Sequence, residues 1–277
     1  MMAAASSAVF GSHLSLLLWL LVAAALPVVA VDRSKFRNCK QGSFCRRYEK
    51  YTQHVLQTGS FVHELQSDSL SKEGSNAVLG RLTHVVRTEG VDTPDGGGGG
   101  RPAPRPLPLR VAFYREQVSG HCGIVRVTID EESPELPRFR LREGDVIVKD
   151  LDPDEVTLLS PAADTPGQPT VIQSTSPGNC SLHLYRSPFE AWLWAGGRLL
   201  QRLNARHLLN FEQHRSKEAH AAAGGPIVDA TDVDSSDLWD EAFGDFHDGK
   251  PRGPSAAAID VTFERAPVLV GLAEHAT

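Results

Sequence analysis

Acidic side chains are the residues of this sequence best suited to chemistry, and they cluster in the run Asp229–Glu241 (DATDVDSSDLWDE). A calcium-binding helix–loop–helix that began at Asp232 would need glycine at its sixth position and glutamate at its twelfth. Those positions hold Asp237 and Phe243. We therefore expect the run to be a solvated loop, and we predict no metal site.

Other catalytic patterns are also absent from the sequence. The histidines at 207, 214, 220 and 247 are not spaced four apart around a glutamate, as they are on zinc-hydrolase helices. Glycoside hydrolysis needs two carboxyls about 5–10 Å apart across the sugar, and no two acids end two clearly predicted strands. Asp130, Glu131 and Glu132 are expected to be turn residues. We predict no catalytic residue, no substrate-binding residue and no cofactor.

Residues 1–30 have the character of a targeting segment. The apolar run Leu14–Leu26 (LSLLLWLLVAAAL) has the length of a signal-peptide core and is short for a membrane span. Val28 and Ala30 are small residues at the positions that precede a cleavage site. The region before the apolar run contains no lysine or arginine, so an uncleaved anchor over 14–29 is the alternative.

Entry into the secretory pathway would place the four cysteines in an oxidising compartment. Cys39 and Cys45 are close in sequence, with Gly42 between them to let the loop bend. We expect them to form a small local disulfide, because a zinc site would need further cysteine or histidine ligands nearby.

The second pair of cysteines is less constrained. Cys122 and Cys180 lie beside strand-like segments, and they either pair with each other or remain buried thiols. Asn179-Cys180-Ser181 is an N-x-Ser sequence, which makes Asn179 a candidate glycosylation site. A disulfide at Cys180 would hinder that modification.

Short apolar alternations separated by proline, glycine and aspartate predict many strands, and they favour a mainly β fold, an antiparallel β-sandwich. No helices of comparable periodicity alternate with them, which counts against a parallel α/β fold. The segments with this pattern are 79–86, 124–130, 138–142, 146–148, 156–159, 170–172, 182–184 and 259–263.

The stretch Pro188–His214 is predicted to be a core hairpin. Apolar residues alternate along 189–195, and Gly196-Gly197 can adopt the positive φ angles of a two-residue turn. Trp192 and Trp194 fall on the face opposite these apolar residues.

The expected organisation follows from these elements. Five consecutive glycines followed by alternating prolines cannot bury a core. A short helix is expected over Tyr51–Leu65. The predicted parts are a signal peptide (1–30), an arm with the first strands (31–90), a flexible Gly/Pro-rich loop (91–108), and a β-sandwich (109–277) with a polar loop (215–257). The formal charge of −6 is too mild to suggest nucleic-acid binding.

Segments of the chain resemble, in order, the glucosidase II α-subunits of glycoside hydrolase family 31. The resemblance is strongest in PFEAWLWAGGRLLQRLNARHLLNFEQHR. It departs over 91–108 and 216–225, and Thr277 stands where the family has aspartate in its G-x-x-E-H-A-D turn. The resembling segments are Val31–Cys45, Arg126–Val148, Pro188–Arg215, Leu238–Phe263 and Val270–Thr277.

This resemblance implies the galactose-mutarotase-like N-terminal β-sandwich of that family. It implies a parent activity in the endoplasmic-reticulum lumen, removal of α-1,3-linked glucose from N-glycans, and a β-subunit partner. The family's catalytic aspartates lie on a (β/α)₈ barrel, which needs about 250 residues, and we expect no barrel after Thr277. Only structural roles therefore transfer, namely the Cys39–Cys45 disulfide and the 188–214 hairpin.

The leading hypothesis is a glucosidase II-like α-subunit truncated before its barrel and inactive alone. One alternative is a stand-alone carbohydrate-binding or scaffolding module, with Trp192 and Trp194 as a sugar platform. Another is a structural protein anchored in the membrane by 14–29.

Overall fold

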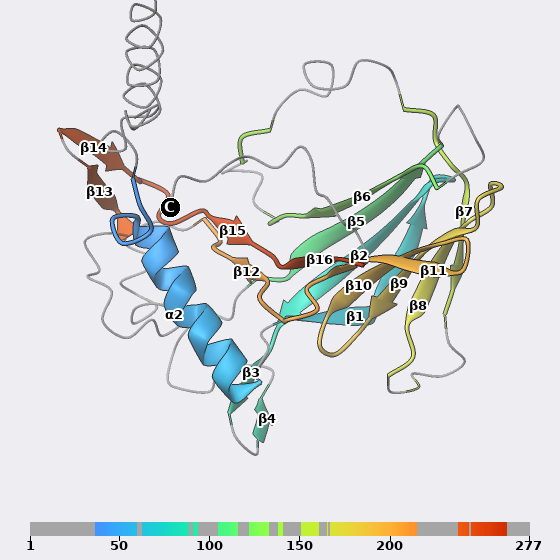
Figure 1. Ribbon diagram of the computed structural model, residues 1–277, viewed down its shortest axis with the longest axis horizontal. Helices are drawn as coiled ribbons and strands as arrows, with labels where there is room; N and C mark the ends of the chain where they lie inside the picture. Colours follow the sequence, from blue (N-terminus) through green and yellow to red (C-terminus); the bar gives the residue numbers. More distant parts are fainter. Residues whose placement is uncertain are drawn as a thin grey trace, which may run out of the picture. The chain divides into compact units, whose positions relative to one another are not determined.

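The described part of the computed structural model contains a β-sandwich and the long helix α2 (Figure 1). The chain divides into two compact units, Met1–Asn38 with Glu274–Thr277, and Cys39–Ala273. The account below concerns the second unit. The structure describes residues 37–59, 63–88, 91–93, 105–115, 122–132, 138–140, 151–160, 165, 167–214, 238–243 and 245–264. The expected targeting segment 1–30, the strand at 146–148 and the segment 270–277 lie outside these residues.

The first sheet has four antiparallel strands in the order β1-β2-β5-β6. Val78 and Leu82 of β2 and the leucine and valine side chains of β5 are buried in the core. Burying one such side chain contributes about 1.5–3 kcal/mol. The strands are β1 (His63–Glu73), β2 (Ala77–His84), β5 (Leu107–Tyr114) and β6 (Ile124–Ile129).

The second sheet has six antiparallel strands in the order β16-β11-β10-β9-β8-β7. Burial alternates along β8 and β9, as expected for strands with one face on a core. The strands are β7 (Val156–Leu159), β8 (Thr170–Ser174), β9 (Cys180–Tyr185), β10 (Glu190–Ala195), β11 (Arg198–Leu203) and β16 (Val261–Phe263).

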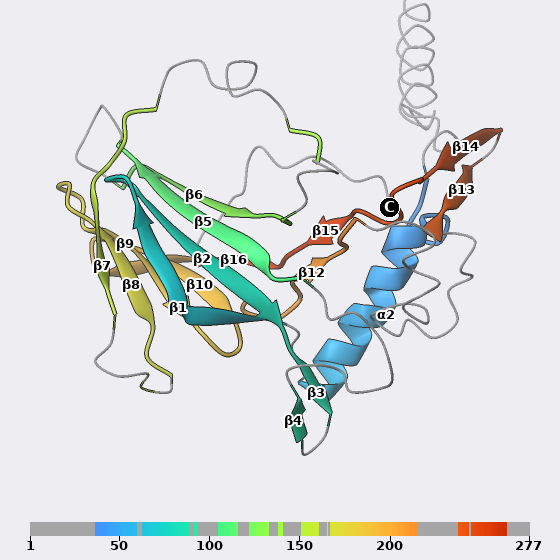
Figure 2. The ribbon, with the colours of Figure 1, turned by 180° about the vertical axis from the view of Figure 1, so that it is seen from behind.

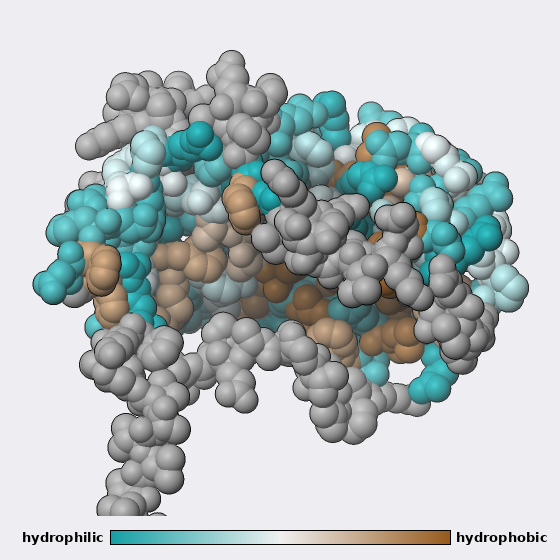
Figure 3. All heavy atoms as spheres, turned by 90° about the horizontal axis from the view of Figure 1, so that it is seen from above, coloured by the Kyte–Doolittle hydropathy of each residue, from teal (hydrophilic) through white to brown (hydrophobic). Residues whose placement is uncertain are grey.

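One hydrophobic core fills the space between the two sheets. It combines Leu82 and Phe113 of the four-stranded sheet with Ile172, Leu182 and Ala191 of the six-stranded sheet. The view from behind shows the two sheets as separate layers (Figure 2), and apolar residues gather between hydrophilic ones in the view from above (Figure 3). The predicted antiparallel β-sandwich is therefore confirmed.

A disulfide between Cys122 and Cys180 joins the two sheets. Cys122 lies just before β6, and Cys180 is the first residue of β9. This observation decides between the two alternatives that the sequence left open for these cysteines. The two half-cystines are 58 residues apart, so the bond closes a long loop.

The predicted hairpin is present as β10 and β11. Gly196 and Gly197 have φ angles of 55° and 74°, the positive values that this two-residue turn requires. A bulge after Leu193 shifts the register of the pair. Trp192 and Trp194 occupy the outer face, opposite the buried Ala191.

The helix α2 spans Ser43–Thr58 and begins eight residues earlier than expected. It ends at Gly59, whose φ of 66° allows the left-handed cap that donates to the Val55 carbonyl. The expected extension to Leu65 is wrong, because Leu65 belongs to β1 and is buried in the core. Cys39 and Cys45 form a disulfide at the start of this helix, as expected. No helix in the described part of the chain is long and apolar enough to cross a membrane.

The expected division at residues 91–108 also needs correction. Strand β5 begins at Leu107 and pairs with β2, so strands from both sides of the loop share one sheet. Pro108 does not prevent this, because it lies near the strand's end, where one missing N–H is tolerated, and its carbonyl accepts from Asp130.

Small two-stranded sheets complete the described fold. Strands also occur in segments that were expected to be loops, namely β4 at the start of 91–108 and the pair β13–β14 within 215–257. The strand expected at 138–142 is wrong in its described part, because residues 138–140 are irregular. The pairs are β3 (Val86–Thr88) with β4 (Val91–Thr93), β12 (Asn210–Phe211) with β15 (Ala257–Ala258), and β13 (Asp240–Phe243) with β14 (Phe246–Gly249).

Two histidines face each other across β1 and β2. The His63 and His84 rings form an edge-to-face pair with centroids 5.7 Å apart, and His63 is only 6% exposed. Burial, together with the neighbouring His84, lowers the pKa of His63 to about 3. Burial likewise lowers the pKa of His84 to about 4. Both rings are therefore neutral at pH 7 in the folded protein.

These two histidines predict that the protein loses stability as the pH falls from about 6.5 toward 4. The unfolded chain takes up protons on both rings near pH 6.5, whereas the folded protein does not, so each pH unit costs up to about 1.4 kcal/mol per histidine. The variant His84→Gln should lose less stability than the unmutated protein between pH 7 and pH 5, by roughly 1–2 kcal/mol. Denaturant titration at both pH values measures this difference.

His54→Gln is the control, because His54 lies on the exposed face of α2. Its pH dependence should match that of the unmutated protein. Identical pH slopes for His84→Gln and the unmutated chain would contradict the prediction.

Candidate functional site

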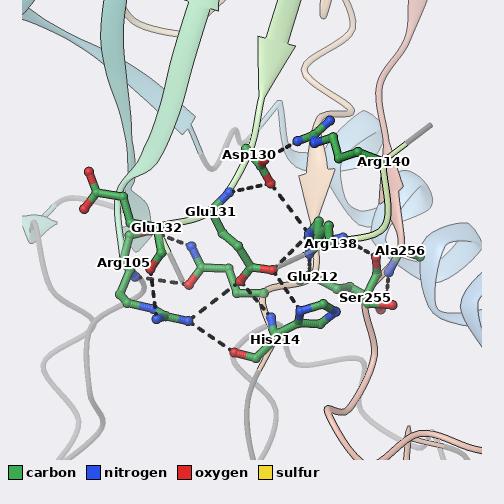
Figure 4. Close-up of polar contacts among 11 residues, drawn as sticks. Arg105, Asp130, Glu131, Glu132, Arg138, Arg140, Glu212, His214, Ser255 and Ala256 are labelled. Carbon is green, nitrogen blue, oxygen red and sulfur yellow. Dashed lines mark hydrogen bonds and ion pairs between the residues drawn. The ribbon is translucent and has the colours of Figure 1, made fainter. Parts of the chain in front are cut away.

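A buried polar network centred on Glu131 links parts of the chain that are distant in sequence (Figure 4). The Glu131 side chain follows β6 and is only 2% exposed. Its Oε1 accepts a hydrogen bond from Arg138 Nε at 2.9 Å, and its Oε2 accepts one from the His214 backbone N–H at 2.9 Å. The His214 ring nitrogen Nδ1 lies 3.4 Å from Oε1. Both oxygens of this carboxylate are therefore engaged.

The Arg138 guanidinium extends the network to two further segments. Its terminal nitrogens donate to the backbone carbonyls of Ser255 and Glu212. Its central carbon lies 4.2 Å from the centroid of the Phe211 ring, a cation–π arrangement. One side chain thus holds the end of β6, the strand β12 and the segment before β15 together.

Arg105 closes the network on the side of β5. Its backbone pairs with the Gln213 side chain, which accepts from the Arg105 N–H at 3.2 Å and donates to its carbonyl at 2.6 Å. The guanidinium donates to the carbonyls of Glu132 and His214, both at 3.2 Å. The segment 212–214 is therefore fixed from two directions.

Glu212 connects the network to helix α2. Its Oε1 accepts from Arg47 Nε at 2.9 Å and from Arg47 Nη2 at 2.7 Å. Its Oε2 accepts from the Ala256 backbone N–H at 3.0 Å. Arg47 and Glu212 are both largely buried, so this ion pair is shielded from solvent.

The same helix is held at its start and along its buried face. The Glu241 carboxylate accepts from the Ser43 N–H at 2.6 Å, where a negative charge favours the helix N-terminus, and it also pairs with Lys250. The hydroxyls of Tyr48 and Tyr51 donate to the carbonyls of Leu208 and Leu209, each at 3.1 Å. Burial raises the pKa of the Tyr51 hydroxyl, which keeps it protonated as a donor.

The arrangement supports a structural role better than an acid–base one. General acid–base catalysis requires a carboxyl that can exchange a proton with a substrate, whereas Glu131 and Glu212 each have both oxygens bound to protein donors. Among the described residues, no group of three His, Cys, Asp or Glu side chains could hold a metal ion.

The sequence did not reveal this network. Glu131 was expected to be a turn residue, yet it is the buried centre of the cluster. Arg138 and Glu212 fall inside the family-like segments, but local spacing could not show that they lie near Glu131 in space. Of the residues that the sequence singled out, Asn179 is exposed in the turn between β8 and β9.

Solved structures with the same fold include those of glucosidase II alpha subunit. A crystal structure of glucosidase II alpha subunit with bound Glc1Man2 aligns with a TM-score of 0.59 and 23% identity, covering 83% of this chain and 23% of that one. The catalytic subunit in an ER glucosidase II heterodimeric complex aligns with a TM-score of 0.58 and 22% identity. At these identities the likeness establishes the fold.

Curated relatives match along most of the chain. Neutral alpha-glucosidase AB of Mus musculus is 27% identical over 285 residues, covering 96% of this chain and 26% of the relative. Glucosidase 2 subunit alpha of Schizosaccharomyces pombe is 32% identical over 104 residues, covering 38% of this chain and 10% of the relative. The chain spans about a quarter of the length of the first relatives that it matches.

The family match covers the larger part of the sandwich. Residues 108–277 match the glycosyl hydrolase 31 N-terminal galactose mutarotase-like domain. This range includes every strand from β6 onward and the network residues from Glu131 to Ala256. Because the match covers more than half of the sequence, the chain belongs to glycoside hydrolase family 31 through its N-terminal galactose mutarotase-like domain.

Proposed function

We propose that this chain forms the non-catalytic N-terminal region of a glucosidase II-type α-glucosidase in the endoplasmic reticulum. The parent enzyme would remove α-1,3-linked glucose from N-glycans, and this region would serve as its rigid support. The observation that carries the proposal is the Glu131 network. It joins three segments that resemble the glucosidase II α-subunits, Arg126–Val148, Pro188–Arg215 and Leu238–Phe263, through the hydrogen bonds of the Arg138 guanidinium.

The proposed support also holds the N-terminal helix. Arg47 and Tyr51 attach α2 to the segment that follows β11, and the Cys39–Cys45 disulfide lies at its start. A regulatory β-subunit is the proposed partner of the parent enzyme, because one structural relative is a catalytic subunit in complex with the binding domain of a regulatory subunit. N-glycans would be reached through the full-length enzyme.

The outer face of the six-stranded sheet bears on the alternative of a stand-alone sugar-binding module. Trp194 stacks on His183 with centroids 5.5 Å apart, and Trp192 lies against Tyr185 at 4.6 Å. Arg202 lies on the neighbouring strand β11, and its guanidinium carbon is 5.6 Å from the centroid of the Trp192 ring. These rings contact one another, whereas a sugar platform needs open ring faces. The arrangement favours a packing surface over a sugar platform.

The support role predicts that Glu131 is essential to stability. Glu131→Gln keeps the size of the side chain but removes the charge that pairs with Arg138. Leaving one partner of a buried pair unmatched costs about 3–5 kcal/mol, and we expect a loss of this size in the free energy of unfolding, measured by denaturant titration.

Glu132→Gln is the matched control, because the adjacent Glu132 is 52% exposed and pairs with Arg81 at the surface. Exposed pairs are worth about 0–1 kcal/mol, so this variant should stay within that range. Equal losses in the free energy of unfolding for the two variants would contradict the proposed role of Glu131.

The proposal also predicts that the 277-residue chain does not hydrolyse α-glucosides. The purified chain, incubated with a chromogenic α-glucoside, should release no more chromophore than a heat-denatured sample. Turnover that co-purifies with the folded chain would contradict the non-catalytic assignment. The Glu131→Gln variant distinguishes an activity of this chain from that of a contaminating enzyme. Only an activity of this chain should decrease when the substitution destabilises the fold.

A further inference from the structure

Asn179 occupies the exposed turn between β8 and β9 and begins the sequence Asn179-Cys180-Ser181, the one N-x-Ser/Thr match in the 277 residues. Its φ of 50° places it in the left-handed region that asparagine tolerates. Its side-chain oxygen accepts from Gln173 Nε2 at 3.1 Å. Within the described part of the chain, the amide nitrogen Nδ2 has no partner, and this is the atom to which an N-glycan is attached.

The other two residues of the sequence are built into the folded sheet. Cys180 is 4% exposed and is bonded to Cys122 across the sandwich. Ser181 pairs with Trp194 on one side and with Gln173 on the other, and its hydroxyl is 3.1 Å from the His183 ring nitrogen Nε2. A transferase that recognises the serine hydroxyl therefore cannot engage this segment once β9 has joined its sheet.

From this juxtaposition, we propose that Asn179 carries an N-linked oligosaccharide, added before β9 folds and before Cys122 and Cys180 pair. The folded state accommodates the product, because the Asn179 side chain points from an exposed turn. The Gly196 N–H contacts the Asn179 carbonyl at 3.3 Å, so the turns of the β8–β9 and β10–β11 hairpins share this end of the sheet. A glycan there would keep this end of the sandwich in solvent and exclude it from any protein interface.

Two covalent steps compete for this segment. In the first, a bond forms between Asn179 Nδ2 and the anomeric carbon of an oligosaccharide. The bond from that carbon to a lipid pyrophosphate breaks, and the amide gives up one proton. In the second, the thiols of Cys122 and Cys180 pass two electrons and two protons to a disulfide-bonded oxidant. Pairing of Cys180 removes the flexible segment that the first step requires.

The inference rests on the proposed entry into the secretory pathway. One experiment tests this entry and the glycosylation of Asn179 separately. The full chain is translated in vitro with endoplasmic-reticulum microsomes and then treated with protease or with an endoglycosidase specific for N-linked glycans. We expect a protease-protected chain with a gel shift of one glycan that the endoglycosidase removes. Asn179→Gln and Ser181→Ala should abolish the shift without altering protection.

The order of events is tested with Cys122→Ala, which leaves the sequence at 179–181 intact but prevents the Cys122–Cys180 bond. The glycosylated fraction should rise in this variant, and it should rise in the unmutated chain when reductant is added during translation. Cys39→Ala is the control, because its disulfide lies in a different part of the chain. The readout is covalent, so it does not require that a variant fold.

Each remaining outcome overturns a distinct claim. A protected chain without a shift, or a shift that persists in Asn179→Gln, overturns the modification site and leaves secretory entry standing. Equal glycosylation of Cys122→Ala and the unmutated chain overturns the proposed order. A chain fully digested by external protease overturns secretory entry, and the modification with it.

Discussion

A buried carboxylate must find charged or polar partners, and in this protein that requirement falls on Glu131. Removing an ionised carboxyl from water costs several kcal/mol, which only well-placed donors can offset. The donors come from Arg138 and His214, the latter 83 residues further along the chain. The end of β6, the segment after β12 and the segment before β15 must therefore reach their positions together. The sandwich supplies the hydrophobic driving force, and the carboxylate selects one arrangement of these irregular segments.

Sequence patterns were sufficient where a single local rule determined the structure. The hairpin of β10 and β11 follows from period-two alternation and from two glycines at the turn, where both residues have positive φ angles. The sandwich follows from many short apolar strands. In each case the residues that decide the structure are neighbours in sequence.

Sequence patterns failed where distant residues determined the structure. Glu131, which follows a strand beside two other acids, resembles a turn residue, and its burial depends on Arg138 and His214. The start of α2 was missed because the segment before Tyr51 is polar and basic, although Phe44, Tyr48, Tyr51 and Val55 recur at helical spacing. Glu241 stabilises that start from almost 200 residues away. The pairing of β5 with β2 was hidden by the prolines and glycines of the intervening loop.

The central claim is that the carboxylates of Glu131 and Glu212 hold irregular backbone as firmly as the sheets hold their strands. Hydrogen exchange of the His214 and Ala256 backbone amides tests it most directly, since each amide donates to one of these carboxylates and neither residue lies in a strand. The account predicts exchange as slow as that of Leu182 in the centre of β9. Exchange of the His214 amide at the rate of an unstructured peptide, while Leu182 stays protected, would contradict it.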